Sequence, residues 1–311
     1  MPQPVCAAED FAAMFREFGA EGTAARLGIS TRSVFSRRRR VERELGITLA
    51  VPGSTPSSHP ERHHTSVEHG IVLVFGDCHY WPGEPPTAHR ALVQFLKTYG
   101  HRVKIIIANG DIFDGARISR HPSTQWEQLP SVKQELEAVD ERLHEIDLAC
   151  PHAEKIWNVG NHDTRLESYL VQRAPEMMGV DGMTLKERFP RWTPAVSTWI
   201  NDAVVVKHRY KGGVHAPGNN TKDAGKSVIT GHMHSQKVYP WTDYNGCRWG
   251  VDAGCIAEPF GPQFTYNEDN PRNQRAGFAV LTFHDWELLD PELVRVNRPG
   301  EVVFRGKRWS V

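Results

Sequence analysis

Short apolar runs in this sequence repeatedly end in a glycine that is followed by carboxylate, amide or imidazole side chains. The fullest example is Gly160-Asn161-His162-Asp163, which follows the apolar run at residues 156–159. Three further runs end in a similar way, at Asp77 with His79, at Gly110-Asp111 with Asp114, and at Gly231-His232 with His234. In open α/β folds, ligands collect beyond the carboxyl ends of the strands. The four clusters therefore predict one metal site assembled from distant parts of the chain.

The spacing inside each cluster limits how its side chains can be arranged. Side chains two positions apart on a strand share a face, so Asp77 and His79 are expected to hold one ion. The same rule pairs His232 with His234. A glycine before each ligand lets the backbone turn sharply and lets neighbouring strand ends converge. A single histidine at a strand end is more often a hydrogen-bonded structural residue, but the ordered set favours a metal centre.

From about residue 71 the chain alternates between predicted strands and helices. We expect strands at 71–75, 103–108, 155–159, 203–207 and 227–230, and helices at 86–99, 132–149 and 164–173. Beyond His234 the pattern is β-rich, with strands expected at 237–241, 247–251 and 277–283. Thr164 and Glu167 have the spacing of a capping box, and Asp163 is expected to be a helix N-cap rather than a ligand. The pattern predicts an α/β sandwich with a mixed sheet or two facing sheets.

Residues 1–50 predict a separate all-helical domain. Helical segments are expected from Phe11 to Gly19, around residues 24–27, and from 31 to 45 with Ser30 or Thr31 as N-cap. The sequence resembles a helix-turn-helix module, whose arginines would contact DNA phosphates. The candidate contacts are Arg32, Arg37, Arg38, Arg39 and Arg40. The alternative is a helical cap whose arginines face water. Residues 51–68 are rich in Pro, Ser and His and predict a linker, which leaves 69–311 as the main domain.

Composition excludes several classes of protein. The 37 basic and 37 acidic side chains give a formal net charge of zero, so no global field draws the chain to nucleic acid or acidic lipid. Five cysteines without a CxxC pair indicate a reducing compartment. The apolar runs are too short to span a bilayer, and the N-terminus lacks the pattern of a signal peptide. We therefore expect a soluble cytoplasmic protein without a membrane partner.

The clusters occur in the order typical of a known superfamily. Together with His208, they resemble the ordered motifs of the calcineurin-like metallophosphoesterases over residues 71 to about 260. The resemblance implies a four-layer α/β/β/α sandwich, here preceded by the helix-turn-helix-like domain, and a binuclear metal centre. It implies Asp77, His79 and His234 at the first metal and Asn161, His208 and His232 at the second, with Asp111 between them. His215 lies in the same loop as His208 and is the alternative ligand.

The chemistry of these residues agrees with that implication. Two divalent ions stabilise the attacking and leaving oxygens of a phosphoryl displacement, and the water between them becomes the nucleophile as hydroxide. A mixed Asp, Asn and His set suits manganese, our first choice, or iron, zinc or nickel better than calcium or magnesium. His162 is expected outside the metal shell, where it would protonate the leaving oxygen as a general acid. Asp114 would fix the tautomer of His162.

The motif variants narrow the substrate. Gly-Asn-His-Asp is similar to the nucleotidase, phosphodiesterase and exonuclease branches, whereas the protein Ser/Thr phosphatases carry Gly-Asn-His-Glu. Tyr80, Arg117 and Arg209 are candidate substrate contacts, since aromatic rings and cations suit a nucleotide or single strand. We predict a phosphodiesterase or nuclease that its first domain delivers to DNA, a combination that resembles phage-borne proteins. The alternatives are a hydrolase of small phosphoesters whose N-terminal helices serve assembly, and a DNA-binding protein with a structural metal site.

Overall fold

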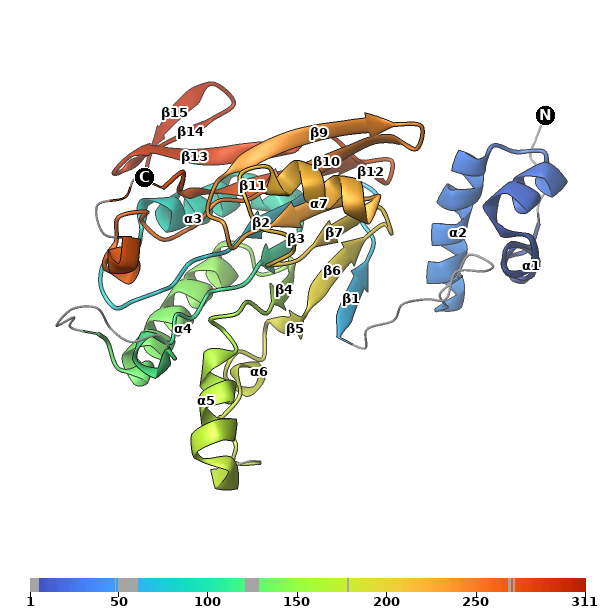
Figure 1. Ribbon diagram of the computed structural model, residues 1–311. Helices are drawn as coiled ribbons and strands as arrows, with labels where there is room; N and C mark the ends of the chain where they lie inside the picture. Colours follow the sequence, from blue (N-terminus) through green and yellow to red (C-terminus); the bar gives the residue numbers. More distant parts are fainter. Residues whose placement is uncertain are drawn as a thin grey trace. The chain divides into compact units, whose positions relative to one another are not determined.

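The structure is a computed structural model that describes residues 6–47, 49, 61–120, 129–177, 179–267, 270 and 272–311. It divides the chain into two compact units, residues 1–60 and residues 61–311, which are described separately (Figure 1). Most of the predicted linker lies outside the described residues. Among the helices within these ranges, none combines the length and the apolar character needed to cross a membrane.

The first unit contains α1 (Ala8–Leu27) and α2 (Thr31–Leu45). Gly19 interrupts α1 with φ 66° and ψ −169°, so the three predicted helical segments are present. Ser30 is the N-cap of α2, because its side chain accepts a hydrogen bond from the Ser33 N–H at 3.1 Å. A small core of Phe11, Phe15 and Val34, with further apolar side chains around it, holds the two helices together.

Two sheets form the centre of the second unit. The first sheet has the strand order β1-β6-β7-β8-β10-β9, with bounds Arg62–Thr65, Ser197–Ile200, Val204–Val206, Ser227–Thr230, Gly246–Asp252 and Lys237–Asp243. The second has the order β15-β14-β13-β11-β2-β3-β4-β5, with bounds Lys307–Ser310, Glu301–Phe304, Glu292–Arg298, Gly277–His284, Gly70–Phe75, Val103–Ala108, Glu154–Asn158 and Thr193–Ala195. Strand β12 (Glu287–Leu288) pairs with β11.

Some helices of this unit cover the outer faces of the sheets, and others extend beyond them (Figure 1). The α-helices of this unit are α3 (Thr87–Tyr99), α4 (Val132–Ala149), α5 (Arg165–Arg173), α6 (Leu185–Arg188) and α7 (Ala216–Ala224). Short 3-10 helices lie at η1 (Gly100–Arg102), η2 (Ala116–Ile118), η3 (Pro175–Met177) and η4 (Pro262–Asn267).

The alternation of side chains along β2 explains the layers. Leu73 and Phe75 point into a core that includes side chains of α3 and α4, whereas Val72 and Val74 point into a second core shared with the other sheet. Helix α7 packs on β8, β9 and β10. The order α3 and α4, sheet, sheet, α7 is the predicted four-layer α/β/β/α sandwich, so the predicted fold is confirmed.

Two local predictions were wrong. The strand β1 (Arg62–Thr65) lies within the range predicted as linker, where it pairs in parallel with β6. The capping box at α5 is absent, because the Thr164 hydroxyl donates to the Asn161 carbonyl at 3.0 Å instead of accepting from the helix. Strand β1 gains its partner from a distant segment, and the Thr164 hydroxyl finds its partner at the Asn161 carbonyl, and the sequence pattern reveals neither partner.

Candidate metal centre

The loops that follow β2, β3, β4, β7 and β8 bring the predicted ligands together. The strands β2, β3 and β4 are parallel, as are β7 and β8, so their carboxyl ends meet at one edge of the sandwich. Two groups of potential ligand atoms form there, each with all atoms within 4.8 Å of one another. The groups are Asp77, His79 and His234, and Asp111, His208 and His232.

A carboxylate lies against an imidazole in each group. His234 Nε2 is 3.0 Å from Asp77 Oδ1, and His208 Nε2 is 3.1 Å from Asp111 Oδ2. Burial alone would lower the pKa of His208, but the Asp111 carboxylate raises it to about 10. Burial would raise the pKa of Asp111, but the surrounding imidazoles, His208 first, hold it below its ordinary range. The site therefore keeps its carboxylates ionised despite their burial.

The backbone at the ligands is not extended, which corrects the strand-face argument. Asp77, His79, Asp111, His232 and His234 all have positive φ, between 42° and 69°. Asp77 and His79 still share a group, but His232 and His234 fall into different groups, so the predicted pairing of these two was wrong. Left-handed backbone is uncommon outside glycine and clusters at functional sites. Its occurrence at five of the seven predicted ligands marks this edge as a strained, functional region.

Glycine allows the ligand loops to approach one another closely. A Cβ added at Gly160 would lie 2.2 Å from Asp111 Oδ1, and one added at Gly231 would lie 2.4 Å from Asp77 Oδ2. Real Cβ atoms essentially never make such contacts, so only glycine fits at these two positions. The predicted role of the glycines that precede ligands is confirmed there.

Several buried atoms have the orientation of metal ligands. His79 Nδ1 lies 3.1 Å from Asp114 Oδ1, and His208 Nδ1 lies 2.8 Å from the Asn109 carbonyl oxygen. Donation of the Nδ1 proton to these oxygens directs Nε2 of each ring toward another partner. The Nε2 lone pair is available at His79, whereas His208 would have to lose its Nε2 proton, held by Asp111, on binding a cation. His79 Nε2 and Asn161 Oδ1 are buried and have no hydrogen-bond partner. Unsatisfied buried acceptors are rare, so the residues present fit divalent cations.

His162 and Asp114 form a third group, which they share with the predicted ligand His79. His162 Nδ1 is 2.7 Å from Asp114 Oδ1, and its Nε2 is 4.0 Å from Asp111 Oδ2. The His162 side chain is 19% exposed, compared with 3% for His208 and 7% for His234. Trp81 Nε1 donates to the other oxygen of Asp114 at 2.9 Å. His162 can therefore meet a ligand from outside while its Nδ1 side is fixed.

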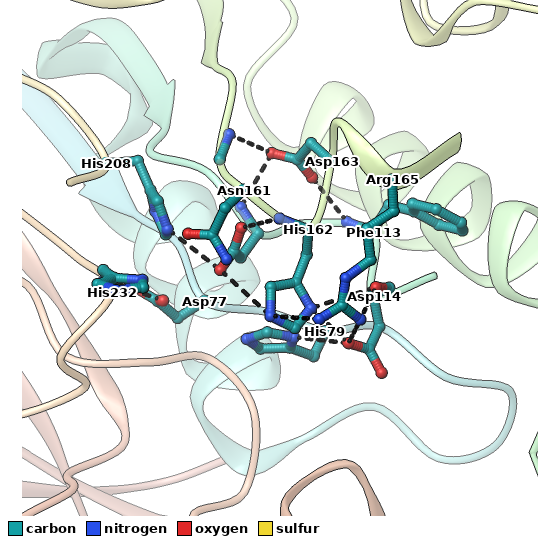
Figure 2. A network of polar contacts seen from close by, with 12 residues as sticks. Asp77, His79, Phe113, Asp114, Asn161, His162, Asp163, Arg165, His208 and His232 are labelled. Carbon is teal, nitrogen blue, oxygen red and sulfur yellow. Dashed lines mark hydrogen bonds and ion pairs between the residues drawn. The ribbon is translucent and has the colours of Figure 1, made fainter. Parts of the chain in front are cut away.

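Sequence reasoning missed Arg165, which completes this group (Figure 2). Its Nη2 donates to His162 Nε2 at 3.1 Å, and its Nη1 donates to the Asp114 carbonyl at 2.9 Å. The signal available in the sequence was its position, three residues after His162 at the start of a predicted helix. An arginine there places a permanent positive charge next to the candidate centre.

Asp163 has a different role from the predicted one. It is buried and is not the N-cap of α5, which is Thr164. Its carboxylate accepts hydrogen bonds at 2.7–3.1 Å from the backbone N–H groups of Asp111, Ile112, Phe113 and Gly160 and from the indole of Trp157. Burial and then the Asp111 carboxylate raise the pKa of Asp163 to about 6, against the lowering effect of these donors. Asp163 thus ties the loop after β3 to the loop after β4.

Of the candidate substrate contacts, one is buried in the core and two are exposed. Tyr80 is 2% exposed, and its hydroxyl lies 2.7 Å from His89 Nδ1 in the core, so its prediction as a substrate contact was wrong. Arg117 and Arg209 are exposed and line a basic pocket that also contains Asn161. His215, the alternative to His208, is exposed at the start of α7 and belongs to neither ligand group.

The arginines of α2 that were predicted to contact DNA include some directed into the first unit and some that are exposed. Arg38 is 8% exposed and bonds to Glu42 Oε1 at 2.9 Å, so it is a structural residue, and its prediction as a DNA contact was wrong. Arg37 donates to the Cys6 carbonyl, and its guanidinium lies over the Phe11 ring, which also directs it toward its own unit. Arg32 and Arg40 are exposed, and Arg39 is half-buried.

Comparison with known proteins identifies the family to which the chain belongs. The family model of the calcineurin-like phosphoesterases matches residues 71–246, and the chain belongs to this family. It is thus a metal-dependent phosphoester hydrolase by class, and the family implies divalent metal ions. A search of curated proteins found no match.

Solved structures resemble the chain only distantly. Vps29 from Entamoeba histolytica with zinc has a TM-score of 0.39 and 15% identity, covering 77% of this chain and 98% of its own. A single mutant of the same Vps29 has a TM-score of 0.36 and 16% identity, covering 78% and 99%. A purple acid phosphatase from yellow lupin (Lupinus luteus) seeds has a TM-score of 0.36 and 12% identity, covering 79% and 53%. We draw no functional argument from similarities at this level.

Proposed function

We propose that the protein hydrolyses phosphodiester bonds of nucleic acid at a binuclear metal centre. The observation that carries this proposal is the pair of carboxylate–imidazole groups with the partly exposed His162 beside both. In this assignment Asp77, His79 and His234 hold one ion. Asn161, His208 and His232 would hold the other, and Asp111 would contribute to both. Manganese is our first choice of metal, because this donor set mixes imidazole with oxygen.

The ions would supply Lewis-acid charge and activate water for attack on phosphorus. The residues of the chain supply the rest of the mechanism. With substrate bound, His162 would carry a proton on both ring nitrogens and give the Nε2 proton to the leaving oxygen, once the Arg165 N–H that donates to Nε2 in this structure turns to the phosphoryl oxygens. Asp114 holds Nδ1 and so fixes the orientation of the ring. Trp81, through its hydrogen bond to Asp114, holds that carboxylate in place.

Arg165 adds a fixed charge to this side of the site. Its guanidinium touches His162 Nε2 and is anchored by the Asp114 carbonyl. A planar guanidinium binds phosphate oxygens in a bidentate manner, so Arg165 is suited to stabilise the negative charge that develops on the phosphoryl group. It would also orient the ester relative to the His162 ring.

Hydrolysis of aryl phosphates tests this proposal. Metal-stripped protein is supplied with each divalent ion in turn and assayed on a bis-aryl and on a mono-aryl phosphate, with elemental analysis of the active form. We expect close to two transition-metal ions per chain and a clear preference for the diester. Active protein without bound metal would refute the binuclear centre, and a preference for the monoester would favour a small-phosphoester phosphatase.

We further propose that the first unit binds DNA through the exposed side of α2. Val34, Arg38 and Val41 are its buried residues, so the opposite side presents Arg32, Arg40 and the half-buried Arg39. Replacing Arg32 and Arg40 with alanine should weaken duplex binding and flatten its dependence on salt, since each phosphate contact releases counterions. Cleavage of a bis-aryl phosphate should not change. Unchanged duplex binding would instead favour an assembly role for these helices.

A further inference from the structure

A basic pocket of about 450 Å³ lies along α5, beside the candidate metal centre. We call it the α5 pocket. Its cations are Arg117, Arg120, Arg165, Arg173 and Arg209. No aspartate or glutamate is among the described residues that line it, although the whole chain carries as many acidic as basic side chains. The pocket therefore concentrates positive charge where a negatively charged substrate would approach.

The α5 pocket is continuous with the metal-ligand loops. A second hollow of about 270 Å³ is lined by His208 and Lys207 and shares Asn161, Thr164 and Arg209 with the α5 pocket. His208 and Asn161 are two of the proposed ligands. A substrate bound at the centre thus has a basic surface on the same side, beginning at the ligands themselves.

The length of this surface exceeds that of a single phosphate ester. Arg165, Tyr169 and Arg173 follow one another at a spacing of four residues, so they share one side of α5, and all three line the pocket. Eight residues at 1.5 Å each separate the first from the last by about 12 Å along the helix. Nucleotides in a B-form strand advance by about 3.4 Å each. Arg173 is therefore placed to meet a phosphate three to four nucleotides from the one at His162.

The side chains of the α5 pocket suit a single strand. Guanidinium groups bind phosphate oxygens in pairs of hydrogen bonds. Tyr169 is 45% exposed, and an exposed ring offers a stacking surface for any base. Aromatic stacking combined with a cationic groove is the usual means of binding single strands without sequence preference.

We propose that the α5 pocket is a strand subsite, which binds the phosphates and one base of a single-stranded polynucleotide on one side of the bond to be cleaved. This inference rests on the proposed function and adds where the substrate continues beyond the metal centre. It requires that substrate length matters: a dinucleotide reaches only Arg165, whereas a hexanucleotide also reaches Tyr169 and Arg173.

Binding of labelled oligothymidylates tests the subsite independently of catalysis. Fluorescence anisotropy is measured on the full-length, metal-stripped protein with strands of two to eight nucleotides. We expect affinity to rise at least tenfold between two and six nucleotides. Tyr169→Ala should weaken octamer binding by roughly 5- to 150-fold, the value of one stacked base. The double variant Arg120→Ala/Arg173→Ala should make the log–log salt slope shallower by roughly 1.4, because each lost contact contributes about 0.7 for single strands.

Arg102→Ala serves as the control, because Arg102 is exposed in η1 and lies outside both hollows. Affinity and salt slope should equal those of the unchanged protein. Metal-loaded proteins are then assayed on the octamer and on a bis-aryl phosphate. The double variant should lose at least ten times more kcat/KM on the octamer than on the aryl ester.

The outcomes separate the two proposals. Equal octamer binding by the double variant and by Arg102→Ala would overturn the strand subsite, even if the aryl diester is cleaved. Absence of any dependence on strand length would overturn it as well. Failure to cleave the aryl diester, with intact length-dependent binding, would instead refute the proposed function and leave the pocket as a binding site for single strands.

Discussion

Replacing Asp163 with asparagine should destabilise the protein strongly, although Asp163 is not a proposed ligand or proton donor. One carboxylate oxygen accepts from Ile112 and Phe113, and the other accepts from Asp111, Gly160 and Trp157. An asparagine keeps only one acceptor oxygen. Whichever oxygen is replaced by the NH₂ group, at least two buried N–H donors then face another donor.

The expected loss of stability follows from the number of buried N–H donors that are left unsatisfied. Leaving a buried donor unsatisfied costs about 1–3 kcal/mol, so the free energy of unfolding should fall by roughly 2–6 kcal/mol. For a unit of this size each kcal/mol lowers Tm by about 2–4 °C, which gives a decrease of roughly 4–24 °C. The loops after β3 and β4 carry Asp111 and Asn161, so metal binding should weaken in the same variant.

Thermal unfolding of the metal-free protein is the appropriate assay, since bound metal would add its own stabilisation. It should be measured well above the Asp163 pKa of about 6, where the carboxylate is ionised. Asp140→Asn removes a carboxylate from the exposed side of α4 and is the matched control. A Tm for Asp163→Asn within about 2 °C of this control would refute the idea that Asp163 holds the two loops together.

Three further predictions concern proton transfer, pH and domain organisation. His162→Asn should keep its metals but lose roughly 10²–10⁴ in rate. Steady-state kinetics should show a smaller loss for esters of acidic phenols than for alkyl esters, because an acidic phenol leaves without a proton. Equal losses for the two kinds of ester would contradict the acid role. Burial and then the Asp114 charge raise the pKa of Glu135 to about 8 from 4.5. Protonated Glu135 stabilises the fold fully below about pH 4.5, and this contribution disappears as pH rises through about 8. Urea unfolding should therefore show a smaller loss of stability between neutral and alkaline pH for Glu135→Gln than for the unchanged protein. Parallel curves of stability against pH for the two proteins would contradict this prediction. A chain starting at Glu61 should remain folded and cleave aryl diesters, because β1 begins at Arg62; a chain starting at His69 lacks β1 and should be less stable by circular dichroism, and equal stability of the two would show that β1 is dispensable.

Much of the fold could be predicted because its signals are local. The predicted bounds of β3, α4 and β8 agree with those observed, since apolar alternation, helical spacing and a capping residue all act within a few positions. Strand β1 could not be found in this way. Its four residues are mostly polar or half-buried and gain their partner, β6, from more than a hundred residues away.

In the candidate site, too, local signals could be predicted from the sequence and long-range contacts could not. Residue type and order at the strand ends were enough to indicate a metal centre, because glycine followed by Asp, Asn or His carries its chemistry wherever it lies. The separation of His232 from His234 depends on left-handed backbone at both residues, which packing between loops imposes and local propensity disfavours. An argument from strand periodicity therefore gives the wrong pairing.

Burial decided the remaining roles. Tyr80, Arg38 and Asp163 have side chains that the sequence assigns to a surface, to DNA or to a helix end, yet each is buried against a partner from elsewhere in its unit. Arg165 and the α5 pocket are the opposite case, since their importance comes from charges that only the fold brings side by side. The sequence by itself determined which chemical groups are present. The tertiary structure decided which of them face one another, because distances between loops depend on the packing of both sheets.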